Sequence, residues 1–397
     1  MNLAIKQARG IIMNRYKSIY DKEVFIFIAA FFGIFFLIGH KMGVVNMMNT
    51  LMNTAYDLLI NTVFYIMGVA VLAGAVGALL SEFGVIALFN QLLSRIVGKI
   101  YDLPGASVIG IFTTYLSDNP AILSLAEDHS FISYFKKYQL PALTNLGTAF
   151  GMGMIITTYM IGLSSISGES YVLASLVGNI GAVIGSIVSV RLMLHFTKKK
   201  FGTQARAVSD EKDETLLLDR RMIRDGNVGN RFMQAMLDGG KAGVSIGLDI
   251  IPGVVIVCSL VMILSNGPTN GVYTGAANEG IALLPWIGDK LSFIIQPLFG
   301  FSSSKAIAVP ITSLGAAGAA IGLVPSMIRE GIVHANDIAV FTAMCMCWSG
   351  YLSTHVGMLD KLGYPKLINS AILSHTIGGI VAGISANLIF QILALIL

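Results

Sequence analysis

The chain has few charged residues. Asp, Glu, Lys and Arg make up 12% of its 397 residues, about half the fraction found in an ordinary soluble domain. Hydrophobic residues make up 55%, and the mean hydropathy is +0.75. This shortage of charge excludes a soluble globular domain. Because apolar runs close to the roughly 20 residues needed to cross a bilayer recur along the chain, the sequence predicts an all-α polytopic membrane protein.

Cysteine and catalytic motifs are also scarce. The three cysteines, Cys258, Cys345 and Cys347, lie inside apolar runs, so no disulfide framework is indicated. Met344-Cys-Met-Cys347 offers soft metal ligands, but on a helix its two cysteines point about 200° apart, which argues against a metal site. The chain has no GxxxxGK[ST] phosphate loop and no nucleophile and base at motif spacing. We therefore expect neither an enzyme nor a cofactor.

Basic residues flank the hydrophobic segments and are not interleaved with aromatics, so no nucleic-acid partner is expected. The N-terminal segment and a long polar segment after residue 195 are rich in Lys and Arg, and the positive-inside rule places both in the cytoplasm. Four spans then fit between them. The expected spans are residues 24–40, 58–80, 140–162, 171–195, 246–265, 335–356 and 368–395.

Two segments of about 40 residues, 84–125 and 281–327, are apolar but interrupted by glycine and proline. Such paired segments in two halves of a chain indicate a transporter site built from re-entrant hairpins. Adding 198 to the residue number takes Thr114 to Thr312 and the pair Gly181/Gly185 to Gly379/Gly383. The sequence therefore predicts an internal duplication.

The two copies are expected to be inverted. Loops 163–170 and 265–280 contain no Lys or Arg, which places both outside. The second and fifth spans, which correspond to each other, then cross in opposite directions. The expected parts are a cytoplasmic N-terminus, first span and amphipathic helix, a first repeat, a basic cytoplasmic linker and a second repeat, at residues 1–57, 58–195, 196–245 and 246–397.

The stretch 61–126 combines a Gly-rich span, an amphipathic segment, the turn Leu103-Pro-Gly105 and a broken helix ending in Ser117-Asp-Asn-Pro-Ala121. It resembles the Gate, or nucleoside recognition, domain of bacterial membrane proteins. A divergent copy at 250–357 has Gly300-Phe-Ser-Ser-Ser304 in place of the Leu-Pro-Gly turn. Relatives in this family include concentrative nucleoside transporters, the membrane part of ferrous-iron permeases, and spore-maturation proteins A and B.

This resemblance implies an inverted-repeat fold with about seven spans and two re-entrant helical hairpins. It implies a substrate less firmly. No phosphate loop marks the GTPase domain of an iron permease. The acidic and glutamine residues of the nucleoside-transporter hairpins also have no match here.

The first hairpin gathers the densest polar group: Thr113, Thr114, Ser117, Asp118 and Asn119, followed by Pro120, which frees a backbone carbonyl. Such oxygens replace the water shell of Na⁺ or hold a polar solute. An acid at bilayer depth usually marks an ion or proton pathway, and burial would favour its protonation and H⁺ coupling. The alternative is a solvated loop in which Asp118 caps a short helix.

Further polar candidates lie in the second hairpin and in the third and sixth spans. In the hairpin they provide neutral hydrogen bonds or an anion site at helix amides, or are merely small residues that pack tightly. In the spans, Gly350 allows unwinding, so that broken helices face the hairpin tips. These candidates are Ser302, Ser303, Ser304, Thr312, Ser313, Asn145, Thr148, Ser349, Ser353 and Thr354.

Together these features predict a secondary transporter that moves a small polar, nucleoside-like solute by alternating access, with Na⁺ or H⁺ coupling. The alternatives are a non-transporting membrane assembly factor and a metal-ion permease. The expected partners are the lipid bilayer, the solute and, through the Met- and Asn-rich segment 42–59, a second copy of the chain. The expected location is the bacterial cytoplasmic membrane.

Overall fold

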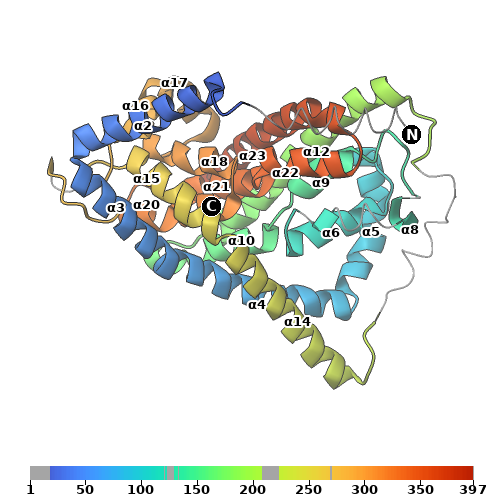
Figure 1. Ribbon diagram of the computed structural model, residues 1–397. Helices are drawn as coiled ribbons and strands as arrows, with labels where there is room; N and C mark the ends of the chain where they lie inside the picture. Colours follow the sequence, from blue (N-terminus) through green and yellow to red (C-terminus); the bar gives the residue numbers. More distant parts are fainter. Residues whose placement is uncertain are drawn as a thin grey trace.

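The computed structural model describes residues 18–119, 121–122, 129–132, 134–207, 223–268 and 271–396. It confirms the all-α polytopic class (Figure 1). In the described part, six helical segments are long and apolar enough to cross a membrane. They are Lys22–Met42 (α2), Val44–Glu82, Ala142–Ser167, Val172–Phe201 (α12), Val228–Ser265 and Pro365–Ile396.

The expected third and sixth spans are both broken helices. The third consists of α9 (Ala142–Thr148) and α10 (Gly153–Gly162), and the sixth of α21 (Ala335–Trp348) and α22 (Tyr351–Lys361). Each second half follows a residue in the left-handed backbone region, Met152 at φ 55° and Gly350 at φ 66°. These two residues are 198 positions apart, as the duplication predicts. The break in α21–α22 leaves two pieces too short to span alone.

The fifth span begins earlier than expected. Helix α14 (Val228–Asp249) starts inside the segment 196–245 that the sequence assigns to the linker, with the Asn227 side chain accepting a hydrogen bond from Asn230 N. Charged and polar residues on its exposed side lower the hydropathy of this part. A stripe of small residues, Gly239, Gly243 and Gly247, packs directly on another helix, so tertiary contact stabilises the extension.

That other helix is α4 (Phe64–Glu82), and the two run antiparallel, since Gly74 meets Gly239 while Ala70 meets Gly243. Each belongs to a longer span containing a π-helical segment: η1 (Leu58–Val63) follows α3 (Val44–Asp57), and η2 (Gly253–Cys258) precedes α15 (Ser259–Ser265). The two π-helical segments are in contact. Antiparallel packing of corresponding spans confirms the inverted repeats. We call this antiparallel pair of spans the crossing pair.

The last helices of the two repeats also pack antiparallel. Gly185 of α12 contacts Gly378 of α23 (Ile368–Ile396), and Gly181 contacts Ala382. Close approach of this kind requires residues without bulky side chains. Helix α21 packs against both α12 and α23. The broken spans and both hairpins pack around these helices (Figure 1). We call this group of helices the hairpin-bearing body, as distinct from the crossing pair.

Each hairpin is approached by an amphipathic or bent segment. In the first, α5 (Val85–Tyr101) leads through a turn to α6 (Ser107–Leu116). In the second, α16 (Leu283–Lys290) and α17 (Ser292–Phe299) lead to α18 (Ala308–Ser313), with a bend of 78° between the two apolar helices. Short helices α19 (Ala317–Gly322) and α20 (Val324–Arg329) complete the second hairpin.

The Asn-rich segment after residue 42 is α3, which continues through η1 into α4 as one 39-residue helical segment. Its polar side chains hold a loop of the second repeat. Asn46 Nδ2 donates to Tyr273 O (3.1 Å), Asn53 Nδ2 donates to Gly275 O (2.8 Å), and Thr54 Oγ1 accepts from Asn278 N (2.7 Å). These polar groups therefore join the segment before the first repeat to the second repeat of the same chain.

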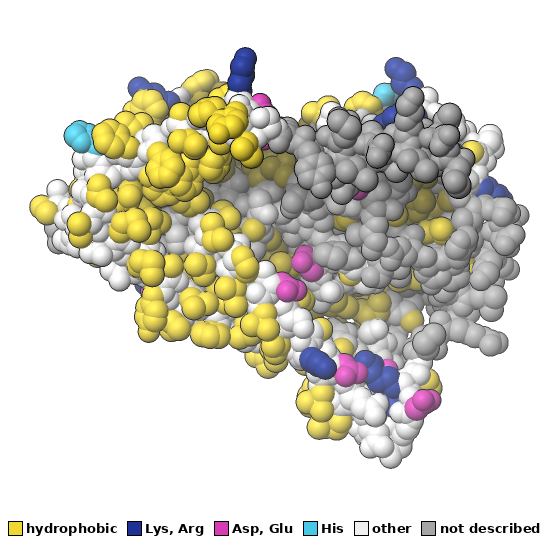
Figure 2. Space-filling view, viewed as in Figure 1, with side chains coloured by type: hydrophobic (Ala, Val, Ile, Leu, Met, Phe, Trp, Pro, Cys, Tyr) yellow, Lys and Arg dark blue, Asp and Glu magenta, His cyan; other side chains and the backbone are white. Residues whose placement is uncertain are grey.

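Charge gathers where α4 ends and α14 begins. The buried Glu82 carboxylate forms ion pairs with Arg224 (2.8 Å) and Arg231 (2.7 Å), and Arg224 also contacts Asp238 (3.2 Å). Figure 2 shows a group of acidic and basic side chains at the end of the molecule where α14 lies, while hydrophobic side chains cover the face over α2, α3 and α4. This distribution matches an apolar belt with a polar end at the basic linker.

Candidate functional site

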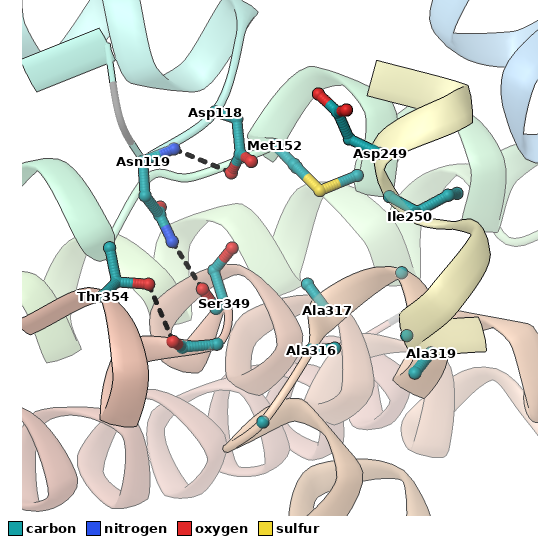
Figure 3. A pocket seen from close by; sticks show the side chains of 14 residues that line it. Asp118, Asn119, Met152, Asp249, Ile250, Ala316, Ala317, Ala319, Ser349 and Thr354 are labelled. Atoms are coloured by element: carbon teal, nitrogen blue, oxygen red, sulfur yellow. Dashed lines mark hydrogen bonds between the residues drawn. The ribbon is translucent and has the colours of Figure 1, made fainter. Parts of the chain in front are cut away.

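The hairpin tips and the breaks of α9–α10 and α21–α22 meet around a hollow of about 200 Å³, which we call the central pocket (Figure 3). The two repeats and the crossing pair all contribute to it. Its lining comprises Asp118, Asn119, Met152, Asp249, Ile250, Gly253, Gly315, Ala316, Ala317, Gly318, Ala319, Ser349, Gly350 and Thr354. The pocket thus occupies the junction of hairpin tips and broken spans at which the sequence predicts a site.

The tip of the first hairpin is fixed by Asn119. Helix α6 ends at Leu116, since Ser117 leaves the helical region (φ −130°, ψ −118°). The backbone N–H of Asn119 donates to Asp118 Oδ1 (2.7 Å), and its Nδ2 donates to the carbonyl of Ser349. Asn119 is 3% exposed, and its Oδ1 has no hydrogen-bond partner among the described residues. This oxygen is closed off from solvent and lies where a Cβ atom on Gly151 would stand.

The tip of the second hairpin is held by backbone groups. Ala316 is extended (φ −159°, ψ 120°) between α18 and α19. Gly350 N, at the break of the sixth span, donates to Ser313 O (2.9 Å). This tip presents only glycine and alanine to the pocket from Gly315 to Ala319. It offers apolar contact and main-chain groups, whereas the first tip offers an acid and an amide.

Gly151 supplies the space that the Asn119 side chain occupies. A Cβ atom at this position would meet Asn119 Oδ1 and come within 2.8 Å of Ser349 Oγ. Gly350 has a different role, because its φ of 66° is a conformation that L side chains rarely adopt. Glycine is therefore needed at the break of the third span, where Gly151 leaves room for Asn119. It is needed at the break of the sixth span because of the backbone conformation of Gly350.

The structure brings four of the predicted site residues to the central pocket: Asp118, Asn119, Ser349 and Thr354. Thr354 Oγ1 donates to the Gly350 carbonyl (2.7 Å), which also accepts from Thr354 N (3.3 Å) at the start of α22. Thr113 and Ser117 line a neighbouring hollow of about 250 Å³ between α6 and the crossing pair. The acid and amide of the first tip thus face one hollow, and the nearby hydroxyls face the next.

Other predicted residues satisfy hydrogen bonds inside the protein. Four hydroxyls donate to carbonyls of their own helical turn: Thr114 to Gly110, Thr148 to Thr144, Thr312 to Ala308 and Ser313 to Pro310. Asn145 Nδ2 donates to Ser189 Oγ (3.0 Å) and to Ala371 O (3.2 Å), linking the third span to both last helices. These contacts are those expected of polar residues that join membrane helices.

The serines 302–304 line a separate hollow of about 200 Å³ beside α16 and α17, at the base of the second hairpin. Ser302 Oγ donates to the buried Asp337 carboxylate (2.6 Å), and Ser303 Oγ accepts from Lys305 N (3.3 Å). The structure does not bring these serines to the central pocket. Ser353 lies on α22, but its side chain and the whole of Pro120 are outside the described residues.

Asp249 and Met152 are pocket residues that the sequence reasoning missed. Asp249 stands roughly midway between Val228 and Ser265, where the charged first half of the span ends and its apolar second half begins. An acid inside a span usually marks a functional site, so this signal was present in the sequence. Met152 carries no chemical signature, and only the fold shows that its left-handed backbone marks the break.

Comparisons with known proteins were consistent with this geometry. No protein-family model and no curated protein sequence matches the chain. Among solved structures, a doubly substituted CNTnw in an outward-facing state aligns with a TM-score of 0.50 and 13% identity over 84% of this chain and 80% of that one. CNTnw in an inward-facing substrate-bound state aligns with a TM-score of 0.44 and 12% identity over the same shares.

CNTnw is a concentrative nucleoside transporter, and likeness to its outward-facing structure shows that the two proteins share a fold. The expected relation to ferrous-iron permeases, spore-maturation proteins and the Gate domain as a family stays a prediction. The chain therefore has the polytopic, inverted-repeat fold of a concentrative nucleoside transporter structure.

Proposed function

We propose that the protein is a secondary transporter that moves a small polar, nucleoside-like solute across the bacterial cytoplasmic membrane by alternating access. The observation that carries this proposal is the central pocket, because two inverted hairpin tips and two broken spans converge on it. Discontinuous helices are tolerated at membrane depth where they line a cavity, and inverted repeats give such a cavity two equivalent routes of access.

The moving parts follow from the packing. The hairpins and broken spans are attached to the α12–α23 pair, whereas the crossing pair contributes Asp249, Ile250 and Gly253 from the other side of the pocket. The hairpin side of the boundary presents small residues to the crossing pair: Gly318 faces Ile250, and Gly322 faces Thr62. We expect the hairpin-bearing body to shift against the crossing pair, since small residues interlock little.

The two π-helical segments lie at this boundary. Helix α19 packs on η2, and Cys258 Sγ donates to the carbonyl of Ala319 (2.8 Å). π-helical turns inside α-helices often occur at functional sites because they widen the helix and free backbone groups. Their place beside the second tip supports a boundary that rearranges during transport.

A route to the pocket from the linker end is supported by the hollow that contains Thr113 and Ser117. It runs between α6 and the crossing pair and includes Ser81, next to the Glu82 ion pairs. Ser117 stands directly before Asp118, so the first tip borders both hollows. We expect a solute to enter or leave along this side when the hairpin-bearing body is displaced.

Coupling to Na⁺ or H⁺ is part of the proposal. The Asp118 carboxylate, which lines the central pocket, is a hard oxygen ligand of the kind that binds Na⁺ or exchanges a proton. Neither role needs a resident cofactor.

Uptake by proteoliposomes tests the proposal. Uridine uptake that accumulates with a Na⁺ or H⁺ gradient, and that falls at least about tenfold in Asp118→Asn, is the expected result. Absence of flux for uridine and other small polar solutes, with no change of phenotype in Asp118→Asn, would favour the assembly-factor alternative. Gradient-independent Fe²⁺ uptake would favour the metal-ion permease. The described residues contain no group of three or more His, Cys, Asp and Glu side chains suited to a metal.

Orientation is proposed from charge, with the N-terminus and the linker in the cytoplasm and residues 58–195 and 246–397 as the two repeats. Lys137 N donates to Ala205 O near the linker, while Val272 is exposed in the loop held by α3. We expect Lys137→Cys to react with impermeant maleimide only after the membrane is opened, and Val272→Cys to react in intact cells. Equal labelling of both from outside would refute the inverted arrangement. Cross-linking of intact cells tests the expected homo-oligomer.

A further inference from the structure

Both hairpins contact the break of the sixth span. Asn119 Nδ2 of the first tip donates to the Ser349 carbonyl, and Gly350 N donates to Ser313 O beside the second tip (2.9 Å). Ser349 and Gly350 also line the central pocket. The shape of the pocket therefore depends on where the end of α21 lies, and a group that fixes this end acts on the pocket without lining it.

His375 of α23 is such a group. Because α21 ends at Trp348, carbonyl groups of its last turn lack partners within the helix. The imidazole Nε2 of His375 lies within hydrogen-bond distance of one of them, the Cys347 carbonyl. A carbonyl oxygen only accepts, so Nε2 carries the proton and donates. His375 is fully buried and lies outside the lining of the central pocket.

The other nitrogen of the ring joins His375 to the rest of the hairpin-bearing body. With the proton on Nε2, Nδ1 of the neutral ring accepts from Ser189 Oγ on α12 (2.8 Å). Ser189 Oγ accepts in turn from Asn145 Nδ2 on α9 (3.0 Å). All three side chains are fully buried. The hydrogen bonds therefore form one chain from the third span, through both last helices, to the end of α21.

This contact with α21 is specific to the second repeat and to one of two neighbouring histidines. The position 198 residues before His375 is Val177, which is buried and has no side-chain donor. His355 of α22 packs its ring on that of His375, with centroids 4.6 Å apart. The two ring nitrogens of His355 have no hydrogen-bond partner among the described residues. His355 is therefore a buried ring of the same size and place that lacks the bond to α21.

We propose that His375 is a positioning residue for the central pocket. Its Nε2–H fixes the Cys347 carbonyl and thereby places Ser349 where the first tip contacts it. Ser189 and Asn145 hold the ring in the tautomer and orientation that this bond needs. The effect on solute affinity rests on the proposed function, whereas the position of α21 does not.

Substitutions of His375 separate the two ring nitrogens. Glutamine places an amide near the position of Nε2, asparagine places one near that of Nδ1, and phenylalanine keeps a ring without either nitrogen. We expect His375→Phe and His375→Asn to raise the KM for uridine uptake by proteoliposomes at least about threefold, because a positioned hydrogen bond is lost. His375→Gln should stay within about twofold of wild type, since it keeps the donor. The matched control is His355→Phe, which changes the neighbouring buried ring and should behave as wild type does.

A second measurement needs no transport. Hydrogen exchange of the purified full-length protein, read by mass spectrometry in peptides that cover residues 345–352, reports how firmly the break is held. We expect exchange there to be at least about fivefold faster than in wild type in His375→Phe and His375→Asn, and unchanged in His375→Gln and His355→Phe. Melting curves show which variants fold. Should His375→Phe not fold, the comparison of His375→Gln with His375→Asn carries the test.

Equal KM and exchange values in His375→Gln and His375→Asn overturn the inference, as does a loss in His355→Phe equal to that in His375→Phe. Unaltered exchange in a folded His375→Phe also overturns it. Faster exchange without a change of KM in a transporting protein would leave His375 a purely structural residue and contradicts its role in the pocket.

Flux keeps the two proposals distinguishable. A wild type that takes up no solute contradicts the transporter, and the exchange pattern then decides the role of His375. Uptake by wild type, with KM and exchange unchanged in all His375 variants, contradicts that role and leaves the transporter standing.

Discussion

The two hairpin tips share a backbone plan but differ in chemistry. Ser117-Asp-Asn119 and Gly315-Ala-Ala317 are 198 positions apart, and both interrupt a helix beside the central pocket. The first tip presents an acid and an amide tied to the break of the sixth span; the second presents methyl groups and is tied to the same break through main-chain atoms. Duplication therefore supplies the shape twice, whereas the polar chemistry has been kept or acquired in one copy.

The largest effect is expected when the charge of the first tip is removed. Asp118→Asn should lower the initial rate of solute uptake at least about tenfold, because a charged hydrogen-bond partner contributes about 1.5–3 kcal/mol. Ala316→Ser adds a small hydroxyl at the corresponding position and should change the rate by less than about threefold. Uptake by proteoliposomes measures both rates. Equal losses in the two variants would show that the tips are functionally equivalent.

A smaller effect is expected from crowding the first tip without changing its chemistry. The Cβ of Gly151→Ala would meet Asn119 Oδ1 and displace the amide from the break of the sixth span. We expect about a three- to tenfold loss of uptake, since misplacement of a binding group costs its orientation. Gly68→Ala is the control, because no atom lies within 4 Å of a Cβ there. An equal loss of uptake in Gly68→Ala would contradict the claim that contact with Asn119 causes the loss in Gly151→Ala.

The break of the sixth span is expected to respond in stability. Gly350→Ala forces an L side chain into the left-handed region at φ 66°, which costs about 1–2 kcal/mol. The added Cβ would also lie 3.0 Å from the Gly315 carbonyl oxygen of the second tip. Gly357→Ala lies in open space on the same helix and should leave the free energy of unfolding unchanged or higher. Thermal unfolding in detergent compares the two variants, and an unaltered melting temperature in Gly350→Ala would contradict the backbone role.

The smallest effect is expected at the base of the second hairpin. Ser303 Oγ accepts from Lys305 N and is distant from the central pocket in the packing. Its replacement in Ser303→Ala should reduce stability by about 1 kcal/mol or less, as for a lost helix cap, and should change uptake by less than about twofold. A tenfold loss of uptake would indicate that the serines 302–304 take part in solute binding.

The membrane class, the positions of most spans and the duplication follow from residues visible in the sequence. Apolar runs of spanning length fix the spans, and the 198-residue offset predicts the correspondence that Met152 and Gly350 show in the backbone. Polar residues were less informative. Asp118 and Ser304 look similarly placed in broken apolar segments, yet one lines the central pocket and the other a hollow at the hairpin base.

The early start of α14 shows that the bounds of a helix, like the location of a polar side chain, depend on contacts that the sequence pattern does not reveal. The polar residues on its surface predict a linker. The helix extends into this segment because Gly239 and Gly243 pack on α4, a contact between residues more than 160 positions apart.

The sequence by itself determined that the chain is a helical membrane protein with two related halves, because hydropathy and spacing are local or periodic properties. It also contained the acid at position 249, in the middle of the fifth span. Tertiary structure alone decided that Asp249 lines the same pocket as Asp118, that Asn119 ties the first tip to the break of the sixth span, and that the second tip lines the pocket with glycine and alanine. Those facts depend on which helices cross and how closely their small residues let them approach, and such long-range contacts leave no periodic trace in the order of residues.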